Sequence, residues 1–260
     1  MIALDLRGKT AIVTGGSQGV GAGIARAAAA AGAAGLCLHG RSAARGRKVA
    51  EEISALGCPT EFVAGDLGDP AGCRALVAVA EKRFGRIDGL VNAAGLTDRG
   101  TIDDTSVELW DRLFAVNVRA PFILTQELVR RLKRDRRPGS IVNIITMSSH
   151  GGQPFLTAYA SSKGALATLT RNTANALRRH RIRVNGLNIG WTDTPGEHAI
   201  QARDGKPADW LAAAEARQPF GRLIKSADVA TFAVYLLSDA AEMMTGALID
   251  FDQNVMGTYD

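Results

Sequence analysis

The chain has 260 residues, of which 46% are hydrophobic and 22% are charged, an ordinary composition for a globular protein. No apolar run approaches the roughly 20 residues that a membrane-spanning helix needs, so we expect no membrane partner. The sequence also begins without the charged and then apolar pattern of a secretory signal. The three cysteines, Cys37, Cys58 and Cys73, lack metal-ligand spacing. We therefore expect a cytoplasmic protein without a metal site.

Lys and Arg outnumber Asp and Glu by 31 to 26, which gives a net charge of +5. Two runs concentrate the basic side chains: Arg130, Arg131, Lys133, Arg134, Arg136 and Arg137, and later Arg178, Arg179, Arg181 and Arg183. Each run follows a helical pattern, where cations are favourable. No aromatic residues interleave them, as a base-stacking surface would need. We expect solvated helix ends and no nucleic-acid partner, with an anionic ligand as the alternative.

Short β-rich runs alternate with longer helical patterns along the chain. We expect strands at 10–13, 35–39, 60–64, 87–92, 141–146, 183–187 and 247–251. We expect helices at 22–31, 42–56, from Pro70 onwards, 106–133, 157–179 and 226–237. Strands separated by helices of this length imply an α/β fold, a doubly wound parallel sheet with helices on both faces. With no linker and no repeat, residues 1–260 are expected to form a single domain.

The least regular stretch is 190–219, which contains Trp191, Pro195, Gly205, Pro207 and Trp210. A long, partly structured insertion in a compact sheet domain is typical of a lid or binding loop. The alternative is a loop that only covers the edge of the sheet.

A glycine-rich turn connects the first strand to the first helix. It reads Thr14-Gly15-Gly16-Ser17-Gln18-Gly19-Val20-Gly21. Glycines let the backbone turn tightly and approach a pyrophosphate closely, and the helix that follows points unpaired N–H groups at the charge. A strand before the turn and a helix after it make this interpretation credible. The turn predicts a dinucleotide-binding site.

The spacing T-G-x-x-x-G-x-G resembles that of the short-chain dehydrogenase/reductase family. Further motifs of that family follow in order: Asp66-Leu67, Asn92-Ala93-Ala94-Gly95, Asn117, and Tyr159 with Lys163 as Y-x-x-x-K. The resemblance covers nearly the whole chain. It implies a Rossmann-like fold, a nicotinamide cofactor, a small-molecule alcohol or carbonyl substrate, and a homodimer or homotetramer.

The resemblance also implies a role for each matching residue. The phosphate turn would use Gly15, Ser17, Gln18, Gly19, Val20 and Gly21. Asp66 and Leu67 would meet the adenine, and Asn92, Ala93, Ala94 and Gly95 would lie along the cofactor. Ile189 and Thr194 would contact the nicotinamide, although the family usually has proline where this chain has Ile189. Lys163 would hold the nicotinamide ribose, and catalytic Asn117 would support a water chain to Lys163.

Tyr159 and Lys163 lie four residues apart on an expected helix, so they share one face. An ammonium group near a phenol favours the phenolate, and we expect it to lower the Tyr159 pKa. Tyr159 would then be the acid/base of hydride transfer. The family usually places a serine thirteen residues before the tyrosine. That position is Thr146 here, which carries an equivalent hydroxyl, with Ser148 as the alternative.

The end of the second strand bears on the choice of cofactor. An acidic residue there would bind the adenosine 2′-hydroxyl and repel a 2′-phosphate. The sequence instead has Gly40 followed by Arg41, and a guanidinium group suits a phosphate. Gln18 stands where many NADP-using relatives carry a cation, so the evidence is divided. We expect NADP to be preferred over NAD.

The substrate pocket is expected between the loop 147–156, the segment after Gly95 and the insertion 191–219. Polar and apolar residues are mixed there: Ser148, Ser149, His150 and Gln153 beside Phe155, Leu156 and Trp191. This mixture favours a sugar or polyol as the substrate. His150 is equally well explained as a structural hydrogen-bonder. The alternatives are a 3-oxoacyl or other keto-reductase and a non-catalytic dinucleotide sensor. A nucleotide-sugar epimerase would need a longer substrate domain and a different glycine turn.

Overall fold

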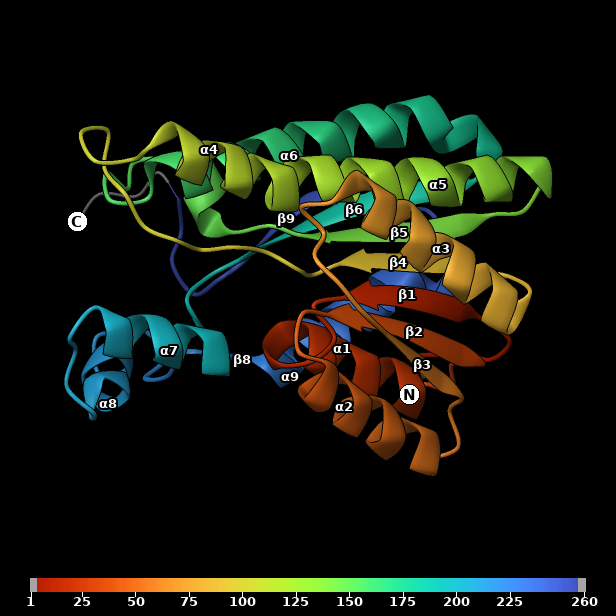
Figure 1. Cartoon of the computed structure of the whole chain (residues 1–260), viewed down its shortest axis with the longest axis horizontal. Coiled ribbons are helices and arrows are strands. Elements are labelled where there is room, and N and C mark those ends of the chain that lie inside the picture. The colour runs from red at the N-terminus through yellow and green to blue at the C-terminus, as the bar shows by residue number, and fades with distance from the viewer. Residues whose placement is uncertain (1–3, 257–260) are drawn as a thin grey trace.

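The computed structural model describes residues 4–256, and Figure 1 shows a parallel sheet between two layers of helices. Seven strands form this sheet in the order β3-β2-β1-β4-β5-β6-β9. Their bounds are β1 Thr10–Thr14, β2 Gly35–Gly40, β3 Thr60–Ala64, β4 Gly89–Asn92, β5 Gly139–Ile144, β6 Ile182–Ile189 and β9 Leu248–Phe251. All neighbouring pairs are parallel. The expected doubly wound α/β fold is confirmed.

Each face of the sheet is covered by its own set of helices (Figure 1). One face packs against α1 Gly19–Ala30, α2 Ala43–Ala55 and α9 Ser226–Leu237. The other packs against α3 Pro70–Phe84, α5 Ala120–Arg134 and α6 Thr157–Leu177. Side chains alternate between the faces of a strand, so Ala11 and Val13 enter the first core while Ile12 enters the second. Burial on both faces explains why the strands are apolar throughout.

The single helix expected over 106–133 is interrupted in the structure. It consists of α4 Val107–Phe114, a π-helical turn at Ala115–Arg119, and α5. Pro121 lies in the first turn of α5, which continues directly from the π-helical turn; because proline has no N–H, it cannot bond the carbonyl one turn earlier, and the regular ladder is interrupted there. The prediction of one regular helix was wrong at this point. Short π-helical turns are frequent at functional sites, and this one contains Asn117.

The segment 190–219 is more regular than its sequence indicates. It contains β7 Thr192–Asp193, α7 Pro195–Arg203 and α8 Trp210–Glu215. β7 pairs with β8 Ile224–Lys225 in a separate two-stranded sheet. In Figure 1 α7 and α8 lie apart from the two helical layers, at the end of the sheet where its strands terminate.

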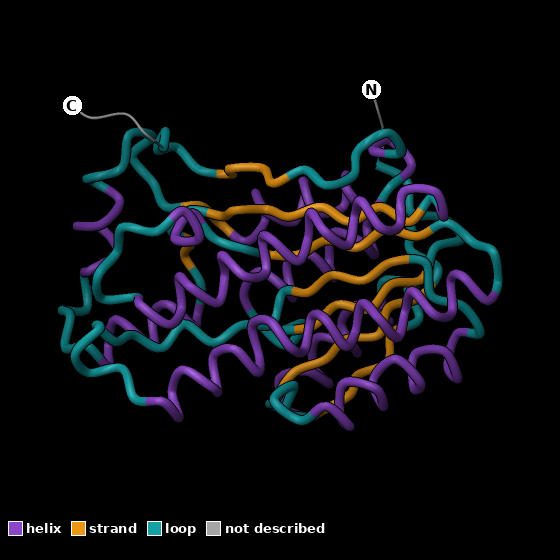
Figure 2. The backbone as a smooth tube through the Cα atoms, turned by 90° about the horizontal axis from the view of Figure 1, so that it is seen from above, coloured by secondary structure: helices purple, strands orange, loops and turns teal. Residues whose placement is uncertain are grey.

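Loops gather at one end of the sheet in Figure 2. Because all strands of the sheet run in the same direction, their carboxyl ends share one edge. The strand order reverses between β1 and β4, and ligands of open α/β sheets bind outside the strand ends at such a switch point. No helix within residues 4–256 has the length and apolarity needed to cross a membrane.

Candidate active site

A cavity of about 780 Å³ opens at the carboxyl ends of the central strands. It brings together most of the residues that the sequence indicates. The predicted site residues that line it are Gly15, Ser17, Gln18, Gly19, Val20, Gly21, Arg41, Asp66, Leu67, Ala93, Ala94, Gly95, Thr146, Ser148, Tyr159, Lys163, Ile189 and Thr194. Asn92 and Asn117 are not among the lining residues; both are buried.

The glycine turn after β1 has the shape that a phosphate cradle needs. A Cβ atom on Gly21 would lie 2.4 Å from the Gly15 carbonyl oxygen, and one on Gly15 would lie 3.0 Å from the Ala94 amide nitrogen. Gly15 and Gly19 also have positive φ values of 69° and 55°. The α1 N-terminus has no side-chain cap and no acidic residue in its first turn. Its free N–H groups therefore fit the pyrophosphate of a dinucleotide.

The end of β2 is positively charged. Arg41 and Arg45 are exposed, line the cavity, and form no ion pair with any residue in 4–256. Ser42 caps α2 by accepting a hydrogen bond from the Arg45 N–H at 3.5 Å. A Cβ on Gly40 would lie 2.6 Å from Ser17 Oγ, so an acidic side chain would be crowded there. Sequence reasoning missed Arg45, although it lies one helical turn after Arg41.

His39 is a second residue that the sequence analysis missed. Its ring is 4% exposed, it lines the cavity, and its Nδ1 atom has no hydrogen-bond partner in the described chain. Burial lowers the His39 pKa to about 4, so the ring is neutral at physiological pH. Buried polar atoms rarely remain without a partner. The free nitrogen therefore fits a cavity that receives a polar ligand.

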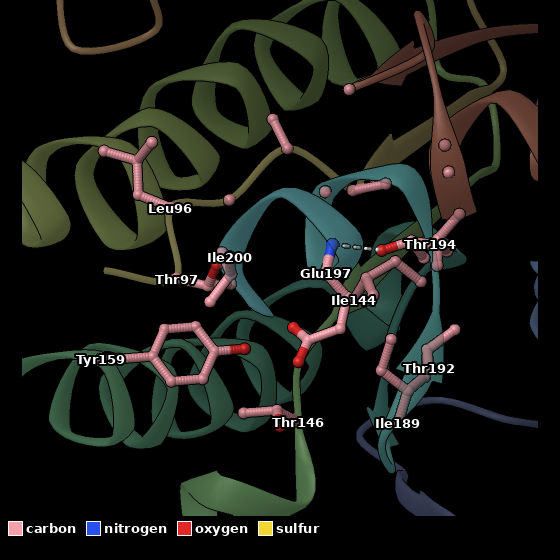
Figure 3. Close-up of a pocket in the computed structure, with 18 of the residues that line it drawn as sticks. Leu96, Thr97, Ile144, Thr146, Tyr159, Ile189, Thr192, Thr194, Glu197 and Ile200 are labelled. Carbon is pink, nitrogen blue, oxygen red and sulfur yellow. Dashed lines mark hydrogen bonds between the residues drawn. The ribbon is translucent and has the colours of Figure 1, made fainter. Parts of the chain in front are cut away.

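Tyr159 and Thr146 meet at the floor of the cavity, where Figure 3 shows the tyrosine ring pointing into it. Burial raises the Tyr159 pKa to about 12, and a hydrogen bond with the Thr146 side chain opposes that rise. The Thr146 hydroxyl also accepts the Ser148 N–H at 3.2 Å and lies 3.3 Å from Ser148 Oγ. Thr146 thus lies between Tyr159 and Ser148, which favours Thr146 as the partner of the tyrosine.

The expected lowering of the Tyr159 pKa by Lys163 is absent. Lys163 is 5% exposed, and its Nζ donates a hydrogen bond of 2.8 Å to the Ile144 carbonyl oxygen. Burial lowers the Lys163 pKa to about 8. Desolvation dominates for both groups, because it disfavours whichever form is charged. In this structure, Tyr159 is therefore a neutral phenol across the physiological range.

Asn117 is 0% exposed in the π-helical turn, where its amide fixes the segment after β4. It accepts a hydrogen bond from the Leu96 N–H at 2.9 Å and donates to the Leu96 carbonyl at 3.0 Å. It also donates to Ser162 Oγ at 3.0 Å. Both N–H groups of its amide thus have partners in the protein, while Oδ1 accepts one bond and keeps a second lone pair.

The Asn92 side chain lies inside the sheet rather than along the cavity. Its Nδ2 donates to Asn143 Oδ1 at 2.8 Å, and Asn143 donates in turn to Thr170 Oγ1 at 2.8 Å. Ala93 and Ala94 do line the cavity. Their N–H groups donate hydrogen bonds to Thr14 Oγ1 at 3.0 and 3.1 Å. Asn92 therefore contributes to ligand binding only by positioning the backbone of Ala93 and Ala94.

Glu197 on α7 faces Tyr159 across the cavity, as Figure 3 shows. Its Oε1 accepts hydrogen bonds from Trp191 Nε1 at 2.9 Å and from Gln201 Nε2 at 2.6 Å, and Arg99 lies 3.7 Å away. The carboxylate contributes to the raised Tyr159 pKa. A single acid in an irregular stretch gave no sequence signal for this position.

Ser149 and His150 do not line the cavity. The Nε2 atom of His150 lies 2.9 Å from Asp250 Oδ1, and Asn188 Nδ2 donates to the same oxygen at 2.7 Å. His150 is therefore a structural hydrogen-bonder, one of the two interpretations that the sequence left open, whereas the expectation that Ser149 lines the pocket was wrong. The other polar and apolar residues expected in the pocket, Ser148, Gln153, Phe155, Leu156 and Trp191, do line the cavity.

Comparison with known proteins identifies the family of this chain. The family model described as enoyl-(acyl carrier protein) reductase matches residues 15–253. The NADP-dependent (R)-specific alcohol dehydrogenase of Lentilactobacillus kefiri is 34% identical over 244 residues, covering 93% of this chain and 94% of the relative. The L-rhamnose 1-dehydrogenase (NAD(P)(+)) of Sphingomonas sp. strain SKA58 is 34% identical over 247 residues, covering 95% and 96%.

Solved structures show the same likeness in three dimensions. The 3-oxoacyl (acyl-carrier-protein) reductase of Agrobacterium tumefaciens C58, solved with NADP bound, superposes with a TM-score of 0.88 at 28% identity. The match covers 97% of this chain and 96% of that structure. Sequence, fold and site agree: the chain belongs to the short-chain dehydrogenase/reductase family of oxidoreductases.

Proposed function

We propose that this protein is an NADP-preferring dehydrogenase/reductase that interconverts an alcohol and a carbonyl, with Tyr159 as its acid/base. The observation that carries the proposal is that one cavity joins the glycine cradle at Gly15–Gly21 to Tyr159, Thr146 and Lys163. When bound, the nicotinamide supplies the acceptor or donor of the hydride. The chain's own residues supply the proton, hold the reacting oxygen and bind the phosphates.

Tyr159 carries the proton in this scheme. With a pKa of about 12, the phenol is protonated at neutral pH and is ready to donate to a carbonyl oxygen as that oxygen gains negative charge. Thr146 donates a second hydrogen bond to the same oxygen. In the opposite direction, Tyr159 must first lose its proton. We therefore expect the rate of oxidation to rise with pH as the phenolate becomes populated, while the protonated phenol serves reduction at neutral pH.

Lys163 and Asn117 complete the proton path. A side chain at residue 95 would lie 3.5 Å from both Lys163 Nζ and Asn117 Oδ1, so Gly95 leaves room between them. Because both N–H groups of the Asn117 amide are bonded within the protein, we assign Asn117 to the water relay to Lys163 as an acceptor, through Oδ1 and its backbone carbonyl in the π-helical turn. Lys163 also suits the ribose hydroxyls of the cofactor.

Arg41 and Arg45 support NADP as the preferred cofactor. Two guanidinium groups without ion-pair partners in the described chain can bind a 2′-phosphate in bidentate fashion. NADP-dependent and NAD(P)-dependent enzymes both occur among the relatives, so the family alone does not decide the preference.

The segment 190–219 is proposed to act as a lid on the substrate. Two ion pairs tie it to the segment after β4: Arg99 with Asp204 at 2.6 Å and Arg203 with Asp98 at 3.1 Å. Exposed or half-buried pairs of this kind are weak, so they can break and reform during turnover. Glu197 and Gln201 on α7 present polar groups to whatever the lid covers.

For the substrate we favour a sugar or polyol. Glu197, Gln201 and Gln153 can bond hydroxyl groups, while Trp191 and Phe155 provide apolar faces. One relative acts on L-rhamnose by name, and a 3-oxoacyl reductase is similar in fold. An acyl ketone is therefore the second candidate. The complete Tyr159/Lys163 pair argues against a purely dinucleotide-sensing protein.

The proposal is tested by screening sugars, polyols, hydroxy acids and 3-oxoacyl esters with both nicotinamide cofactors, reading the absorbance of the reduced form. We expect turnover with NADP exceeding that with NAD, and highest with a polyhydroxylated substrate. Tight NADPH binding without turnover on any class would contradict catalysis and support a sensor. Turnover limited to acyl ketones would overturn the sugar assignment only.

We also propose a homodimer or homotetramer. The small residues Ala160, Gly164 and Ala167 on α6 can pack closely against a neighbouring subunit, as can the region of β9. Trp110 and Phe122 on α4 and α5 are 37% and 46% exposed, which leaves apolar surface for a partner. Light scattering of the purified protein decides this directly, and a monomer at micromolar concentration would contradict it.

A further inference from the structure

The two basic runs of the sequence meet in space. The first lies at the end of α5, and the second begins with the 3₁₀ turn Arg178–His180 after α6. Between them is a second cavity of about 190 Å³, lined by Leu132, Lys133, Arg136, Arg137, Arg179, His180 and Arg181. It lies where the chain enters β5 and β6, at the amino ends of these strands. The catalytic cavity lies at the opposite, carboxyl edge.

Most of the basic residues outside this cavity have a partner elsewhere. Arg130 pairs with Glu127, Arg131 with Glu81 and Glu127, and Arg134 with Glu81 and Asp135. Arg183 donates to the Leu236 and Ser238 carbonyls, and Arg178 donates to Asn175. Among the lining residues, Arg137 is paired with Asp88 at 3.0 Å.

The cations that line the cavity otherwise lack counter-charges. Lys133, Arg136, Arg179 and Arg181 form no ion pair within residues 4–256, and no acidic side chain lines the cavity. Helix capping at these positions uses the backbone and leaves the cationic side chains free. The Lys133 and Leu132 carbonyls at the end of α5 are bonded by the N–H groups of Arg136 and Arg137 at 3.2 and 2.9 Å. All four side chains are exposed, so water and salt screen much of their mutual repulsion, and an anion bound among them would offset the rest.

Two of these arginines have an unusual backbone conformation. Arg136 and Arg181 have φ values of 52° and 56° and are the only non-glycine residues in 4–256 with positive φ. Glycine or asparagine is preferred in this left-handed conformation after a helix, and other side chains are strained there. Both strained positions carry arginine, and both line the same cavity. In both cases the left-handed residue ends a helix, since its N–H bonds the Lys133 or the Arg178 carbonyl, and the turn directs the arginine side chain to the cavity.

We propose that this cavity binds a small phosphorylated anion of about the size of pyrophosphate. Guanidinium groups bind phosphate oxygens in bidentate fashion, and Arg136 and Arg181 offer two such groups from separate elements. A nucleic-acid backbone fits less well. The positive surface is confined to one small cavity, and apart from His180 the lining residues offer no ring on which a base could stack.

Isothermal titration of inorganic pyrophosphate, with and without excess NADPH, tests the site. With NADPH occupying the glycine cradle, we expect one equivalent of pyrophosphate to bind; without NADPH the cradle can take a second equivalent. In the double variant Arg136→Asn, Arg181→Asn, pyrophosphate affinity falls by about tenfold or more, because two bidentate contacts are lost. The same variant melts at the temperature of the parent or above it, since asparagine tolerates positive φ. Unchanged melting therefore separates loss of binding from loss of folding.

The control is the double variant Arg47→Gln, Arg217→Gln, which removes the same charge from exposed positions that line neither cavity. Its pyrophosphate affinity should stay within about twofold of the parent. Equal weakening in both double variants would show that only net charge matters and would overturn the site. Absence of pyrophosphate binding to the NADPH-saturated protein, or displacement by a single-stranded RNA that binds more tightly through Arg136 and Arg181, would also overturn it.

Discussion

The two halves of the catalytic cavity are built by different means. In the cofactor half, backbone atoms form the surface, and Gly15 and Gly21 are fixed by contacts with neighbouring main chain. In the substrate half, long side chains form it: Glu197 holds Trp191 and Gln201 by hydrogen bonds, and Arg99 reaches Asp204. Backbone contacts tolerate little change, whereas exposed ion pairs each contribute about 1 kcal/mol or less. The cofactor half therefore suits a ligand that is always the same, and the substrate half suits ligands that differ between enzymes.

At the boundary between the halves, the choice between Thr146 and Ser148 has the largest expected effect. Thr146→Val removes the hydroxyl that bonds Tyr159 and should lower kcat by about 10²- to 10³-fold, the usual effect of losing a donor to a developing oxyanion. Ser148→Ala should lower it by less than about tenfold. Steady-state kinetics of both variants decide the matter. The reverse ranking would make Ser148 the catalytic hydroxyl.

The rigidity of the cofactor half is tested by Gly21→Ala. The added methyl would lie 2.4 Å from the Gly15 carbonyl oxygen, so the turn must shift and NADPH affinity should fall by about 10- to 100-fold. Gly164→Ala is the matched control, because its methyl would lie at an ordinary 3.5 Å from the Ser149 carbonyl oxygen. Equal NADPH affinities in fluorescence titrations of the two variants would refute a backbone-built cradle.

Cofactor preference should depend on two side chains that lie outside the glycine turn. Arg41→Ala and Arg45→Ala should each lower the ratio of NADPH to NADH affinity by about tenfold, the equivalent of one lost charged contact. Lys48 lies on α2 with Arg45 but does not line the cavity, so Lys48→Ala should leave this affinity ratio unchanged. Loss of NADPH and NADH affinity in equal proportion would mean that neither arginine reads the 2′-phosphate.

Lys163→Met should stabilise the protein at neutral pH while removing activity. The Lys163 pKa is about 8 against 10.5 for a free lysine, so the cost of burying its charge is complete below pH 8. Between pH 8 and pH 10.5, Lys163 is already neutral in the folded state but still charged in the unfolded state. The wild type therefore gains stability as pH rises, and the cost disappears above 10.5. We expect the variant to melt higher by roughly 3–8 °C near neutral pH, with the gap closing at alkaline pH. A lower melting temperature at neutral pH would contradict this.

Much of the fold and of the cofactor half could be predicted because the signals are local. The apolar strands, the glycine turn and the order of the motifs depend on neighbouring residues, and the structure brings these residues together. His39 and Arg45 were missed although they lie beside predicted residues. Neither belongs to a short motif, and their role depends on burial and on the lack of an ion-pair partner.

The substrate half could not be predicted because its contacts join distant segments. Nothing in the sequence pairs Arg99 with Asp204 or brings Glu197 to Tyr159. The same is true of the basic runs, whose unpaired members are separated from the paired ones only by three-dimensional packing. The Tyr159 pKa shows the limit most clearly: spacing alone suggested a lowered pKa, while burial raises it. The π-helical turn at Asn117 is likewise hidden in a regular helical pattern.

The most direct test of the central claim is the Tyr159→Phe variant, measured on the best substrate from the screen. If Tyr159 moves the proton, kcat falls by about 10³-fold or more. The NADPH dissociation constant should stay within about twofold of the wild type, because the cradle is built from Gly15–Gly21 and the arginines. Retention of most of the wild-type kcat, with NADPH binding intact, would contradict the assignment of Tyr159 as the acid/base.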